Sequence, residues 1–464
     1  MKKIKIPFVL QKLNSVFEEN GYEAYLVGGA VRDVLMGKNP SDYDVATNAE
    51  PQEVTRIFKK VIPTGIAHGT VTVHFMKNEI EVTTFRTESD YSDGRHPDNV
   101  AFTRNLNEDL SRRDFTMNAI AASLKDGKIT DPYDGQKDIK NKIIRTVGNP
   151  YERFLEDGLR PIRAIRFSAK LNFKIESETL KSISAPEIIE KTKTISLERF
   201  RDELLKLMQA EKPSEGLKIM EKTGILGIFM PELMPCRGCI QTDFRGFHEF
   251  DVLDHLFYSC DGAPKEKTNV RLAALLHDTG KPAAKKIVPT PQGETVTFYR
   301  HEQYSAEIAR KLLFRLKFSN AEIDNICHLI ENHMFNYEPQ WKDSAVRRFL
   351  VKVKAENVED LFDLRLADIY GMRNTPVRLH DSQTAKLLLE FKERIEKEQQ
   401  KKSALSLKSL AVNGKDLMEA GIPSGKELGT ILNELFETVL EDPAQNEKDT
   451  LMAIAKKIYE NRNL

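Results

Sequence analysis

The sequence predicts an α/β head, in which helices accompany a mixed sheet, followed by an all-α neck, body and tail. The β-rich runs lie before Asp131, the pattern beyond it is almost entirely helical, and 464 residues are too many for one compact core. A prior of roughly 150 residues per domain suggests about three or four units. We therefore expect a head over residues 1–140, a neck over 141–210, a body over 211–370 and a tail over 371–464.

Composition narrows the class of protein. Lys and Arg together number 70 and balance 70 Asp and Glu, which excludes a general polyanion binder held by bulk electrostatics. Any contact with nucleic acid has to come from local clusters of basic residues. No stretch approaches the roughly 18 uninterrupted apolar residues of a membrane helix, and no apolar signal-peptide region follows the N-terminal lysines. We expect a cytoplasmic protein without a membrane partner.

Short runs rich in β-branched and aromatic residues predict the strands of the head. They lie at residues 25–27, 43–47, 70–75 and 79–86, and the last alternates with a period of two. In the helical part, residues 198–208 (ERFRDELLKLM) place Phe200, Leu204, Leu207 and Met208 on one apolar face. This spacing predicts an amphipathic helix. The charged run at residues 390–402 predicts a solvated helix.

Residues 26–33 (LVGGAVRD) run from a predicted strand through two glycines into a predicted helix. Gly28 and Gly29 would let backbone N–H groups approach a phosphate, and the helix N-terminus adds the positive end of its dipole. Arg32 would project from the first turns of that helix toward the same anion. The pattern is not the spaced-glycine dinucleotide fingerprint, so a tight strand-to-helix turn without a ligand stays an alternative at this point.

A pair of carboxylates follows in residues 41–45 (SDYDV). In a strand, Asp42 and Asp44 point to the same face, where their mutual repulsion calls for cations. Mg²⁺ suits such oxygen ligands and bridges to substrate phosphates. Glu81 offers a third carboxylate from a later strand. This layout predicts nucleotidyl transfer, in which two metals activate an attacking hydroxyl and stabilise the departing pyrophosphate.

Here the sequence resembles a known family. Residues 26–47 (LVGGAVRDVLMGKNPSDYDVAT) look like the signature of the CCA-adding tRNA nucleotidyltransferases and bacterial poly(A) polymerases. Further family motifs follow in order: RRDFTMNA at 112–119, DPYDG at 131–135, EDGLR at 156–160, RAIRF at 163–167 and ERFRDEL at 198–204. The resemblance implies a nucleotidyltransferase head with Asp42, Asp44 and Glu81 as catalytic carboxylates, Mg²⁺ as cofactor, CTP and ATP as substrates, and tRNA as partner.

The same resemblance assigns nucleotide-binding roles. Asp157 and Arg160 would act as an amino-acid template for the incoming base. Cytosine and adenine both present an amine donor beside a ring-nitrogen acceptor, which match a carboxylate and a guanidinium, whereas uracil and guanine reverse both polarities. The other expected nucleotide-binding residues are Gly28, Gly29, Arg32, Arg112, Arg113, Asn118, Arg163 and Arg166.

Basic residues dominate the segment that follows Asp157. They recur at three- and four-residue intervals, which places them along one helix face: Arg160, Arg163, Arg166, Lys170 and Lys174. Gly158 and Pro161 weaken a helix at this point, so we expect a kink or a late helix start.

Two segments favour CCA addition over poly(A) synthesis. Residues 64–70 (TGIAHGT) resemble the CCA-adding version of this segment and lack the basic run usual in the poly(A) branch. The polar loop at residues 88–98 resembles the flexible loop that CCA-adding enzymes use when they switch to the final adenosine, with Asp93 and Arg95 as candidate lever residues. A poly(A) polymerase or an enzyme that adds only adenosine stays an alternative. A protein uridylyltransferase and a non-catalytic RNA-binding module are more remote.

Histidines and aspartates in the helical half predict a second chemistry. Residues 270–282 (VRLAALLHDTGKP) form an apolar helix that ends in His277 and Asp278, which are costly to bury unless they are paired or bind a metal. The further candidates are His255 upstream and His301, His333 and Asp368 downstream. His255, His277, Asp278 and Asp368 match the four-ligand motif of HD-type phosphohydrolases, a resemblance that implies a divalent metal and hydrolysis of phosphate esters. His301 and His333 would bind phosphate or a second metal. A degenerate domain with structural histidines is the alternative.

Overall fold

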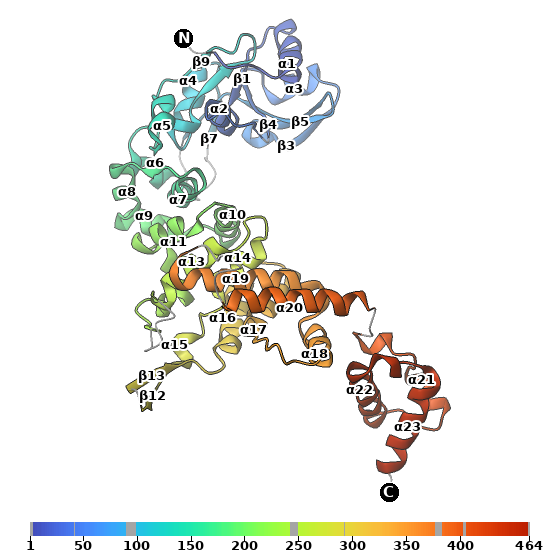
Figure 1. The fold of residues 1–464 in the computed structure, drawn as a ribbon. Helices are drawn as coiled ribbons and strands as arrows, with labels where there is room; N and C mark the ends of the chain where they lie inside the picture. The colour runs from blue at the N-terminus through green and yellow to red at the C-terminus, as the bar shows by residue number, and fades with distance from the viewer. Residues whose placement is uncertain are drawn as a thin grey trace. The chain divides into compact units, whose positions relative to one another are not determined.

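The computed structural model describes residues 3–40, 42–89, 99–241, 249–291, 293–375, 383–401 and 405–462. The chain divides into two compact units (Figure 1). Unit 1 comprises Met1–Met234 with Arg315–Phe318, and unit 2 comprises Pro235–Phe314 with Ser319–Leu464.

A seven-stranded sheet in the order β3-β4-β5-β2-β1-β8-β9 forms the centre of the N-terminal part of unit 1. Its strands are β1 Ala24–Val27, β2 Asp44–Thr47, β3 Val61–Gly65, β4 Thr70–Phe75, β5 Asn78–Thr84, β8 Ala121–Ser123 and β9 Ile129–Thr130. Strands β2 and β5 are parallel and the other neighbours are antiparallel, so the sheet is mixed. The predicted α/β head is confirmed. Strands β6 Arg86–Ser89 and β7 Asn99–Phe102 pair separately as a two-stranded ribbon.

Helices accompany this sheet (Figure 1). They are α1 Phe8–Glu19, α2 Gly28–Leu35, α3 Pro51–Ile57, α4 Leu106–Ser111 and α5 Gly135–Asn141. Helix α1 is amphipathic and fully buries Leu10, Leu13 and Phe17. The Phe17 ring lies 5.1 Å from the ring of Phe58, which in turn lies 5.8 Å from Phe75 on β4. This edge-to-face chain of aromatic rings fixes α1 and the end of α3 against the sheet.

The neck begins with two helices separated by a break. Helix α6 spans Pro150–Glu156 and α7 spans Leu159–Leu171. The predicted late helix start is confirmed, and Pro161 falls in the first turn of α7, where its missing N–H costs no hydrogen bond. A Cβ atom at Gly158 would lie 2.7 Å from the carbonyl oxygen of Lys191, so close packing requires glycine in the break. Lys174 lies in the short strand β11 Lys174–Ile175 rather than on the helix, which corrects the predicted basic face.

Five more helices complete the described part of the neck and its surroundings. They are α8 Ser177–Ile183, α9 Pro186–Lys193, α10 Leu197–Met208, α11 Pro213–Lys222 and α12 Ile225–Phe229. Helix α10 confirms the amphipathic prediction, since the four predicted apolar side chains are all fully buried. The ring of Phe200 on this helix stacks on that of Phe229 with centroids 4.1 Å apart, and the Ser196 side chain caps the helix N-terminus.

Unit 2 is almost entirely helical. Its helices are α13 Val252–Gly262, α14 Thr268–Leu276, α15 Lys281–Ala284, α16 His301–Arg315, α17 Asn320–Asn332, α18 Asp343–Val353, α19 Val358–Arg373, α20 Gln383–Gln400, α21 Gly414–Glu419, α22 Lys426–Glu441 and α23 Lys448–Arg462. Helix α14 is the predicted apolar helix, and all of its residues from Val270 to Leu276 are buried.

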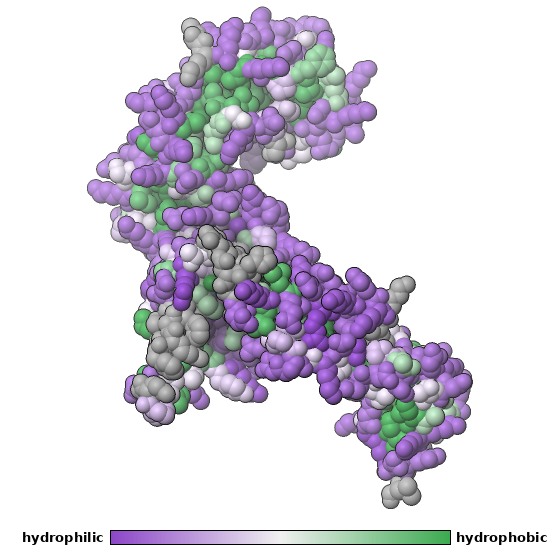
Figure 2. Space-filling view, viewed as in Figure 1, coloured by the Kyte–Doolittle hydropathy of each residue, from purple (hydrophilic) through white to green (hydrophobic). Residues whose placement is uncertain are grey.

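A hairpin in unit 2 was not predicted. Strands β12 Lys286–Thr290 and β13 Gly293–Thr297 pair with each other to form it. A separate short pairing, of β10 Ile143–Ile144 with β11, lies in unit 1. The hairpin is largely exposed, with Ile287 62% accessible, so it lacks the apolar alternation that marks a half-buried strand. Within the described ranges no helix is long and apolar enough to cross a bilayer, and hydrophilic side chains cover most of the face in Figure 2.

Candidate active site and metal cluster

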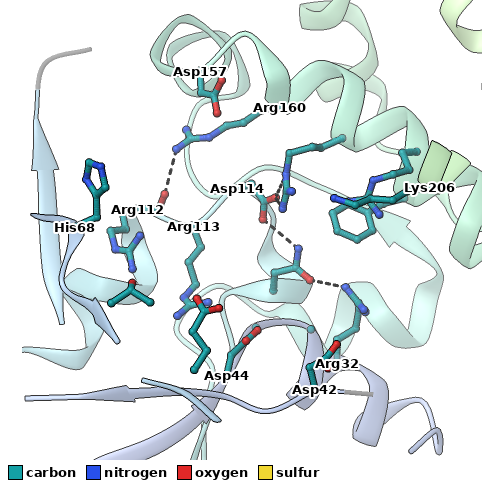
Figure 3. Close-up of a pocket in the computed structure, with 18 of the residues that line it drawn as sticks. Arg32, Asp42, Asp44, His68, Arg112, Arg113, Asp114, Asp157, Arg160 and Lys206 are labelled. Carbon is teal, nitrogen blue, oxygen red and sulfur yellow. Dashed lines mark hydrogen bonds and ion pairs between the residues drawn. The ribbon is translucent and has the colours of Figure 1, made fainter. Parts of the chain in front are cut away.

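A cavity of about 940 Å³ in unit 1 lies between the sheet and helices α7 and α10 (Figure 3). It gathers every catalytic and nucleotide-binding residue that the sequence predicted in the head and neck. These are Gly28, Gly29, Arg32, Asp42, Asp44, Glu81, Arg112, Arg113, Asn118, Asp157, Arg160, Arg163 and Arg166. Residues more than 130 positions apart in the chain therefore share one solvent-accessible space.

The turn from β1 into α2 forms one wall of this cavity. Gly28 has a φ of +66°, and a Cβ atom there would lie 3.2 Å from Arg113 Nη1 and 3.4 Å from Asp44 Oδ2. Glycine is thus required both for the left-handed backbone and for the close approach of these two charged groups. Gly29 follows as the second residue of α2, and its position leaves room for the Arg32 guanidinium. This geometry fits the predicted cradle for an anion at a helix N-terminus.

Three carboxylates line the adjacent wall. Asp44 is the first residue of β2 and lies directly opposite Glu81 in the parallel pairing with β5. Asp42 precedes the strand in a bend, so the prediction that strand alternation aligns Asp42 with Asp44 is wrong, although both side chains line the cavity. Burial raises the pKa of Asp44, as does the neighbouring Asp42 charge, while Arg113 opposes the rise. Burial and the Asp44 charge raise the pKa of Glu81. These all-oxygen donors fit Mg²⁺, which would relieve their repulsion.

A hydrogen-bonded chain fixes the opposite side of the cavity (Figure 3). Arg32 Nη1 donates to Asn118 Oδ1 at 2.9 Å, and Asn118 Nδ2 donates to Asp114 Oδ1 at 3.0 Å. Arg163 donates from Nε and Nη2 to the second Asp114 oxygen at 2.9 and 2.7 Å. Burial alone would raise the pKa of Asp114, but Arg163 and Asn118 outweigh burial and hold it below its ordinary value. The ionised Asp114 therefore orients the Arg163 guanidinium toward the cavity.

A second buried carboxylate orients the arginines of the RRD segment. Arg112 donates from Nε and Nη2 to one oxygen of Asp109 at 3.0 and 2.7 Å, and Arg113 Nη2 donates to the other at 3.1 Å. Asp109 is fully buried, yet the two guanidinium groups lower its pKa against the effect of burial. This shared anchor holds both cationic groups at the cavity wall, and the Arg113 charge acts on Asp44.

Of the two predicted template residues, Asp157 lies in the break between α6 and α7 and Arg160 in the first turn of α7, and different partners hold them. Asp157 accepts from Arg199 Nη2 at 2.9 and 3.2 Å and from the backbone N–H of Leu159 at 2.9 Å. Arg160 Nη1 donates to Glu156 at 2.5 Å, and its Nη2 donates to the carbonyl oxygen of Arg112 at 3.2 Å. The helix break thus brings both side chains to the cavity from one short segment.

Several cavity residues were not among the predicted site residues. Asp114, Arg199 and Lys206 line the cavity, and the last two lie seven residues apart on α10, which is the spacing of one helix face. The seven-residue spacing of Arg199 and Lys206 could have been recognised in the sequence as two basic residues on one helix face. In all, eight arginines and two lysines line the cavity against five acidic side chains, so it attracts a polyanion although the whole chain is neutral. The candidate lever residues Asp93 and Arg95 lie outside the described residues.

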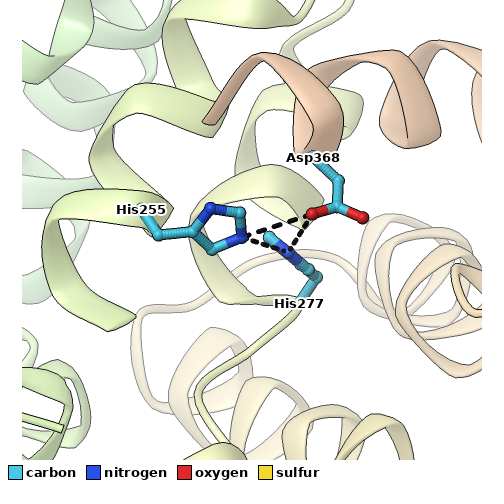
Figure 4. Close-up of side chains that lie close together, drawn as sticks. All are labelled: His255, His277 and Asp368. Carbon is cyan, nitrogen blue, oxygen red and sulfur yellow. Dashed lines mark hydrogen bonds and ion pairs between the residues drawn. The ribbon is translucent and has the colours of Figure 1, made fainter. Parts of the chain in front are cut away.

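Unit 2 brings its six candidate ligands into one buried cluster. They come from five helices or their ends: His255 from α13, His277 and Asp278 after α14, His301 from α16, His333 after α17 and Asp368 from α19. Each is at most 6% exposed. Figure 4 shows the side chains of His255, His277 and Asp368 pointing toward one another. A Cβ atom at Gly371 would lie 2.8 Å from the His255 carbonyl oxygen, so glycine allows α19 to approach α13.

The backbone fixes the orientation of three of these histidines in the same way. In each ring Nδ1 faces the carbonyl oxygen three residues earlier: His277 faces Ala274 at 2.9 Å, His301 faces Phe298 at 2.8 Å and His333 faces Ile330 at 2.8 Å. A carbonyl oxygen only accepts, so Nδ1 carries the hydrogen, and Nε2 has a lone pair whenever the ring is neutral. Those Nε2 atoms all point into the cluster.

The donor atoms of the cluster lie very close together. His255 Nε2 and His277 Nε2 are 3.1 Å apart, and His301 Nε2 and His333 Nε2 are 3.4 Å apart. Burial lowers the pKa of His333 to about 3, with a further contribution from His277. Burial would lower that of His277 as well, but Asp278 and Asp368 raise it to about 10. The set of imidazoles and carboxylates suits a divalent transition metal.

A cavity of about 530 Å³ opens onto one side of the cluster. Besides Asp278, His301, His333 and Asp368, it is lined by side chains that the sequence did not predict: Gln241, Lys281, Phe298, Tyr299, Arg300 and Arg365. Lys281 Nζ lies 2.6 Å from Asp278 Oδ2, and Arg365 Nη1 lies 2.6 Å from Asp368 Oδ2. Cationic and aromatic groups beside a cluster of candidate metal ligands form a site suited to a small phosphorylated ligand.

Comparison with known proteins agrees with this arrangement. The family model described as the Poly A polymerase head domain matches residues 24–145, the Probable RNA and SrmB-binding site of polymerase A matches residues 172–236, and tRNA nucleotidyltransferase domain 2 matches residues 295–455. The CCA-adding enzyme of Lactobacillus johnsonii is 36% identical over 440 residues, covering 94% of this chain and 93% of the relative. That of Levilactobacillus brevis is 34% identical over 443 residues, covering 94% of each chain.

The fold is shared along the whole chain as well. The solved structure of the Bacillus stearothermophilus CCA-adding enzyme in complex with CTP superimposes with a TM-score of 0.74 and 27% identity, and the match covers 99% of both chains. A head followed by a helical remainder is therefore the architecture of these relatives as it is of this protein. The chain belongs to the CCA-adding enzyme family, which shares its head domain with the poly(A) polymerases.

Proposed function

We propose that this protein adds C, C and A in turn to the 3′ end of tRNA, using CTP and ATP and no nucleic-acid template. One observation carries the proposal: a single cavity combines three carboxylates suited to Mg²⁺ with ten cationic side chains suited to a triphosphate and with the Asp157 and Arg160 pair. The CCA-adding relatives, which align with nearly the whole chain, support it. The Bacillus stearothermophilus relative binds CTP.

The chain's own residues would divide the work as follows. Asp42, Asp44 and Glu81 would hold Mg²⁺, which supplies Lewis-acid activation of the terminal tRNA hydroxyl and stabilises the departing pyrophosphate. Arg113, anchored by Asp109 beside Gly28, would neutralise the triphosphate. The guanidinium groups enter the reaction already oriented, so little reorganisation is needed when charge develops on the phosphate.

Base selection would depend on Asp157 and Arg160. A carboxylate that accepts from the exocyclic amine and a guanidinium that donates to the ring nitrogen fit cytosine and adenine alike. Uracil or guanine would instead place acceptor against acceptor and donor against donor, which leaves polar groups unpaired. One pair of side chains can therefore serve both CTP and ATP.

The helical parts would hold the tRNA. We infer that the neck over residues 141–210, the body over 211–370 and the tail over 371–464 contact the folded RNA through its shape and backbone. The match of residues 172–236 to a model described as an RNA-binding site of polymerase A supports this for the neck. With a net charge of zero, binding would depend on local basic groups rather than on the charge of the whole protein.

A product-length assay tests the main proposal. A tRNA that ends before the CCA sequence is incubated with CTP, with ATP, and with both. We expect growth by two nucleotides with CTP alone and by three with both. A long run of adenosines with ATP alone would instead identify a poly(A) polymerase, and growth only on a tRNA that already ends in CC would identify an enzyme that adds adenosine alone.

We propose a second activity for unit 2, the metal-dependent hydrolysis of small phosphate esters. The convergence of histidine Nε2 atoms on Asp278 and Asp368 beside a cation-lined cavity favours it. The residues fit a divalent transition metal, which supplies an activated water and polarises a phosphoryl oxygen. Lys281 and Arg365 would help to orient the phosphate.

Substitution of a cluster histidine tests this second activity. His277→Ala should remove metal-dependent hydrolysis of a phosphomonoester and spare CCA addition. His328→Ala is the matched control, since this histidine of the same unit faces the carbonyl oxygen of Val353 at 2.7 Å and lies outside the cluster. Hydrolysis that survives His277→Ala would overturn the assignment.

A further inference from the structure

Residues 405–462 form a C-terminal bundle that contains α21, α22 and α23 and has a hydrophobic core of its own. Leu417 on α21, Ile431 and Leu435 on α22 and Leu451 on α23 are fully buried in this core. A segment with its own core behaves as one compact body. The position of the C-terminal bundle within unit 2 therefore depends on the contacts that fasten it to the preceding helices.

Helices α18 and α20 belong to a second compact body, which is held together by aromatic rings. Phe391 on α20 is fully buried, and its ring centroid lies 4.8 Å from that of Phe349 on α18 and 5.6 Å from that of Trp341. Tyr337 stacks on Phe391 with the ring centroids 4.6 Å apart. These contacts fix α18 and α20 against each other.

Arg347 on α18 contacts the C-terminal bundle at the end of α22. Its Nε donates to the carbonyl oxygen of Leu440 at 2.7 Å, and its Nη2 donates to that of Glu441 at 3.0 Å. These are the last two residues of α22. The last carbonyl groups of a helix lack partners within the helix and form the negative end of its dipole. A guanidinium group at this point satisfies both the hydrogen-bond acceptors and the charge.

The remaining nitrogen of Arg347 contacts α20. Nη1 donates to Glu398 Oε2 at 2.7 Å, and the two residues are only 5% and 2% exposed. Leaving either charge buried without the other would be strongly unfavourable. The three nitrogens of one side chain thus join the helix that carries it to a carboxylate of α20 and to the carbonyl groups of α22.

Other contacts between α18 and α22 are more exposed. Arg348 donates to Glu437 at 2.9 Å and to Glu441 at 3.0 Å, but its side chain is 45% exposed. Ion pairs in contact with water contribute little to stability. Val351 adds a partly buried apolar contact with the core of the C-terminal bundle. Among the hydrogen bonds described between α18 and α22, those of Arg347 are therefore the ones most withdrawn from water.

We propose that Arg347 is a positioning residue for tRNA: it fastens the C-terminal bundle to α18 and α20, so that the bundle holds the folded RNA in a fixed place. This inference rests on the tRNA binding proposed above for the helical parts and names a contact on which that binding depends. A body that is already fixed loses less freedom on binding than a mobile one, so it binds more tightly. Arg347 is not among the described lining residues of the unit 1 cavity, so it acts on tRNA affinity and not on the chemical step.

The double variant Arg347→Met with Glu398→Leu tests the proposal in the full chain. It removes the guanidinium without leaving an unpaired buried charge, so the chain should fold. Hydrogen exchange, measured by mass spectrometry, should become at least about fivefold faster in the last turn of α22. The KM for a full-length tRNA that ends before CCA should rise about tenfold, which corresponds to about 1.4 kcal/mol. The kcat, and the KM for an acceptor-stem hairpin without the tRNA elbow, should stay within about twofold.

Two further variants and one fluorescent residue provide the controls. Arg348→Ala on the same helix removes only exposed ion pairs and should change each value by less than about twofold. Arg347→Lys keeps a charge beside Glu398 but lacks the planar set of donors, so it should show a smaller change in the same direction and tests the proposal if the double variant does not fold. Trp341 is the only tryptophan of the chain and packs against Phe391, so its unchanged emission reports intact packing of α18 and α20.

The possible results separate the fastening from the tRNA role. Unchanged exchange in α22 would overturn the proposal, because the C-terminal bundle would remain fastened without Arg347. Recovery of the natural KM for tRNA in the double variant, when Arg347→Met alone raises it, would reduce Arg347 to a partner for the Glu398 charge. An equal rise of the KM for tRNA and for the hairpin would also overturn the positioning role. Faster exchange with an unchanged KM for tRNA would leave the fastening standing and overturn tRNA binding by the C-terminal bundle.

Discussion

The cavity of unit 1 and the cluster of unit 2 are the two sites for which we propose metal-assisted phosphate chemistry, and they differ in their donor atoms. As candidate metal ligands the head offers only carboxylate oxygens, from Asp42, Asp44 and Glu81, and the arginines of the same cavity could bind an anion. The cluster offers imidazole nitrogens with two carboxylates and is buried on nearly all sides. Oxygen ligands in an open cavity suit a hard ion that arrives with its nucleotide, whereas nitrogen ligands in a closed cluster suit a resident transition metal.

The two sites also differ in what supports the ligands. In the head, buried carboxylates such as Asp109 and Asp114 orient arginines, so the supporting network prepares the site for substrate phosphates. In the cluster, backbone carbonyl groups orient the histidine rings and leave their Nε2 lone pairs facing inward. The comparison indicates that the supporting network of the head orients groups for a substrate anion, whereas that of the cluster orients nitrogen atoms that could bind a metal.

The largest expected effect comes from the head carboxylates. Asp42→Asn with Asp44→Asn keeps the side-chain shapes but removes the charges that would hold Mg²⁺, so incorporation of both CMP and AMP should fall by at least about 1,000-fold. Product lengths on a gel measure this. tRNA binding and phosphate-ester hydrolysis should persist. Incorporation within tenfold of the unsubstituted protein would show that these carboxylates do not hold the catalytic metal.

Brief chelation should separate the two metals. A short treatment with EDTA should lower CCA addition by at least about 100-fold, because an open oxygen site exchanges Mg²⁺ rapidly, and Mg²⁺ alone should restore it. The buried cluster should keep at least half of its hydrolysis over the same interval. Parallel assays of the two reactions on one sample provide the measurement. Equal loss and equal recovery with Mg²⁺ would contradict the distinction between the sites.

The two sites were also unequally predictable from sequence. The head was predicted in detail because its ligands lie in short motifs, where one turn sets the position of Gly28 and Arg32 and one strand sets that of Asp44. The exact geometry was not predictable, since the bend that removes Asp42 from the strand depends on the packing around it. The partners of Asp157 and Arg160 were likewise set by tertiary contacts with Arg199 on α10 and the backbone of Arg112.

The cluster was predicted as a set of residues but not as a geometry. Its candidate ligands span residues 255–368, and spacing along the chain cannot show that one Asp278 oxygen lies 3.2 Å from His255 Nε2 and the other 3.0 Å from His301 Nε2. Nor could it show the exposed hairpin β12–β13, whose strands pair only with each other. Local patterns thus predicted which residues carry chemistry, and the packing of five helices determined how they meet.

Base selection should show an intermediate effect. Arg160→Ala removes the donor expected to face the ring nitrogen of cytosine or adenine, so discrimination of CTP against UTP should weaken by about 10- to 100-fold. Arg160→Lys keeps the positive charge but lacks the planar guanidinium, so it should recover only part of the discrimination between CTP and UTP. The ratio of kcat/KM values for CTP and UTP is the readout. If the ratio stays constant while both values fall, Arg160 has a structural role only.

The smallest expected effect concerns Arg199, which donates hydrogen bonds to the Asp157 carboxylate and so helps to orient it. The two side chains are 18% and 16% exposed, so the free energy of their ion pair should be about 1 kcal/mol, and Arg199→Ala should lower kcat/KM by about fivefold for CTP and ATP alike. Arg199→Lys should restore part of this loss. Arg201→Ala on the same helix, outside the described cavity lining, is the matched control. Asp157 also accepts from the backbone N–H of Leu159, so its carboxylate should keep part of its orientation in the Arg199→Ala variant. A loss of kcat/KM as large as that caused by Arg160→Ala would instead indicate that Arg199 itself contacts the nucleotide.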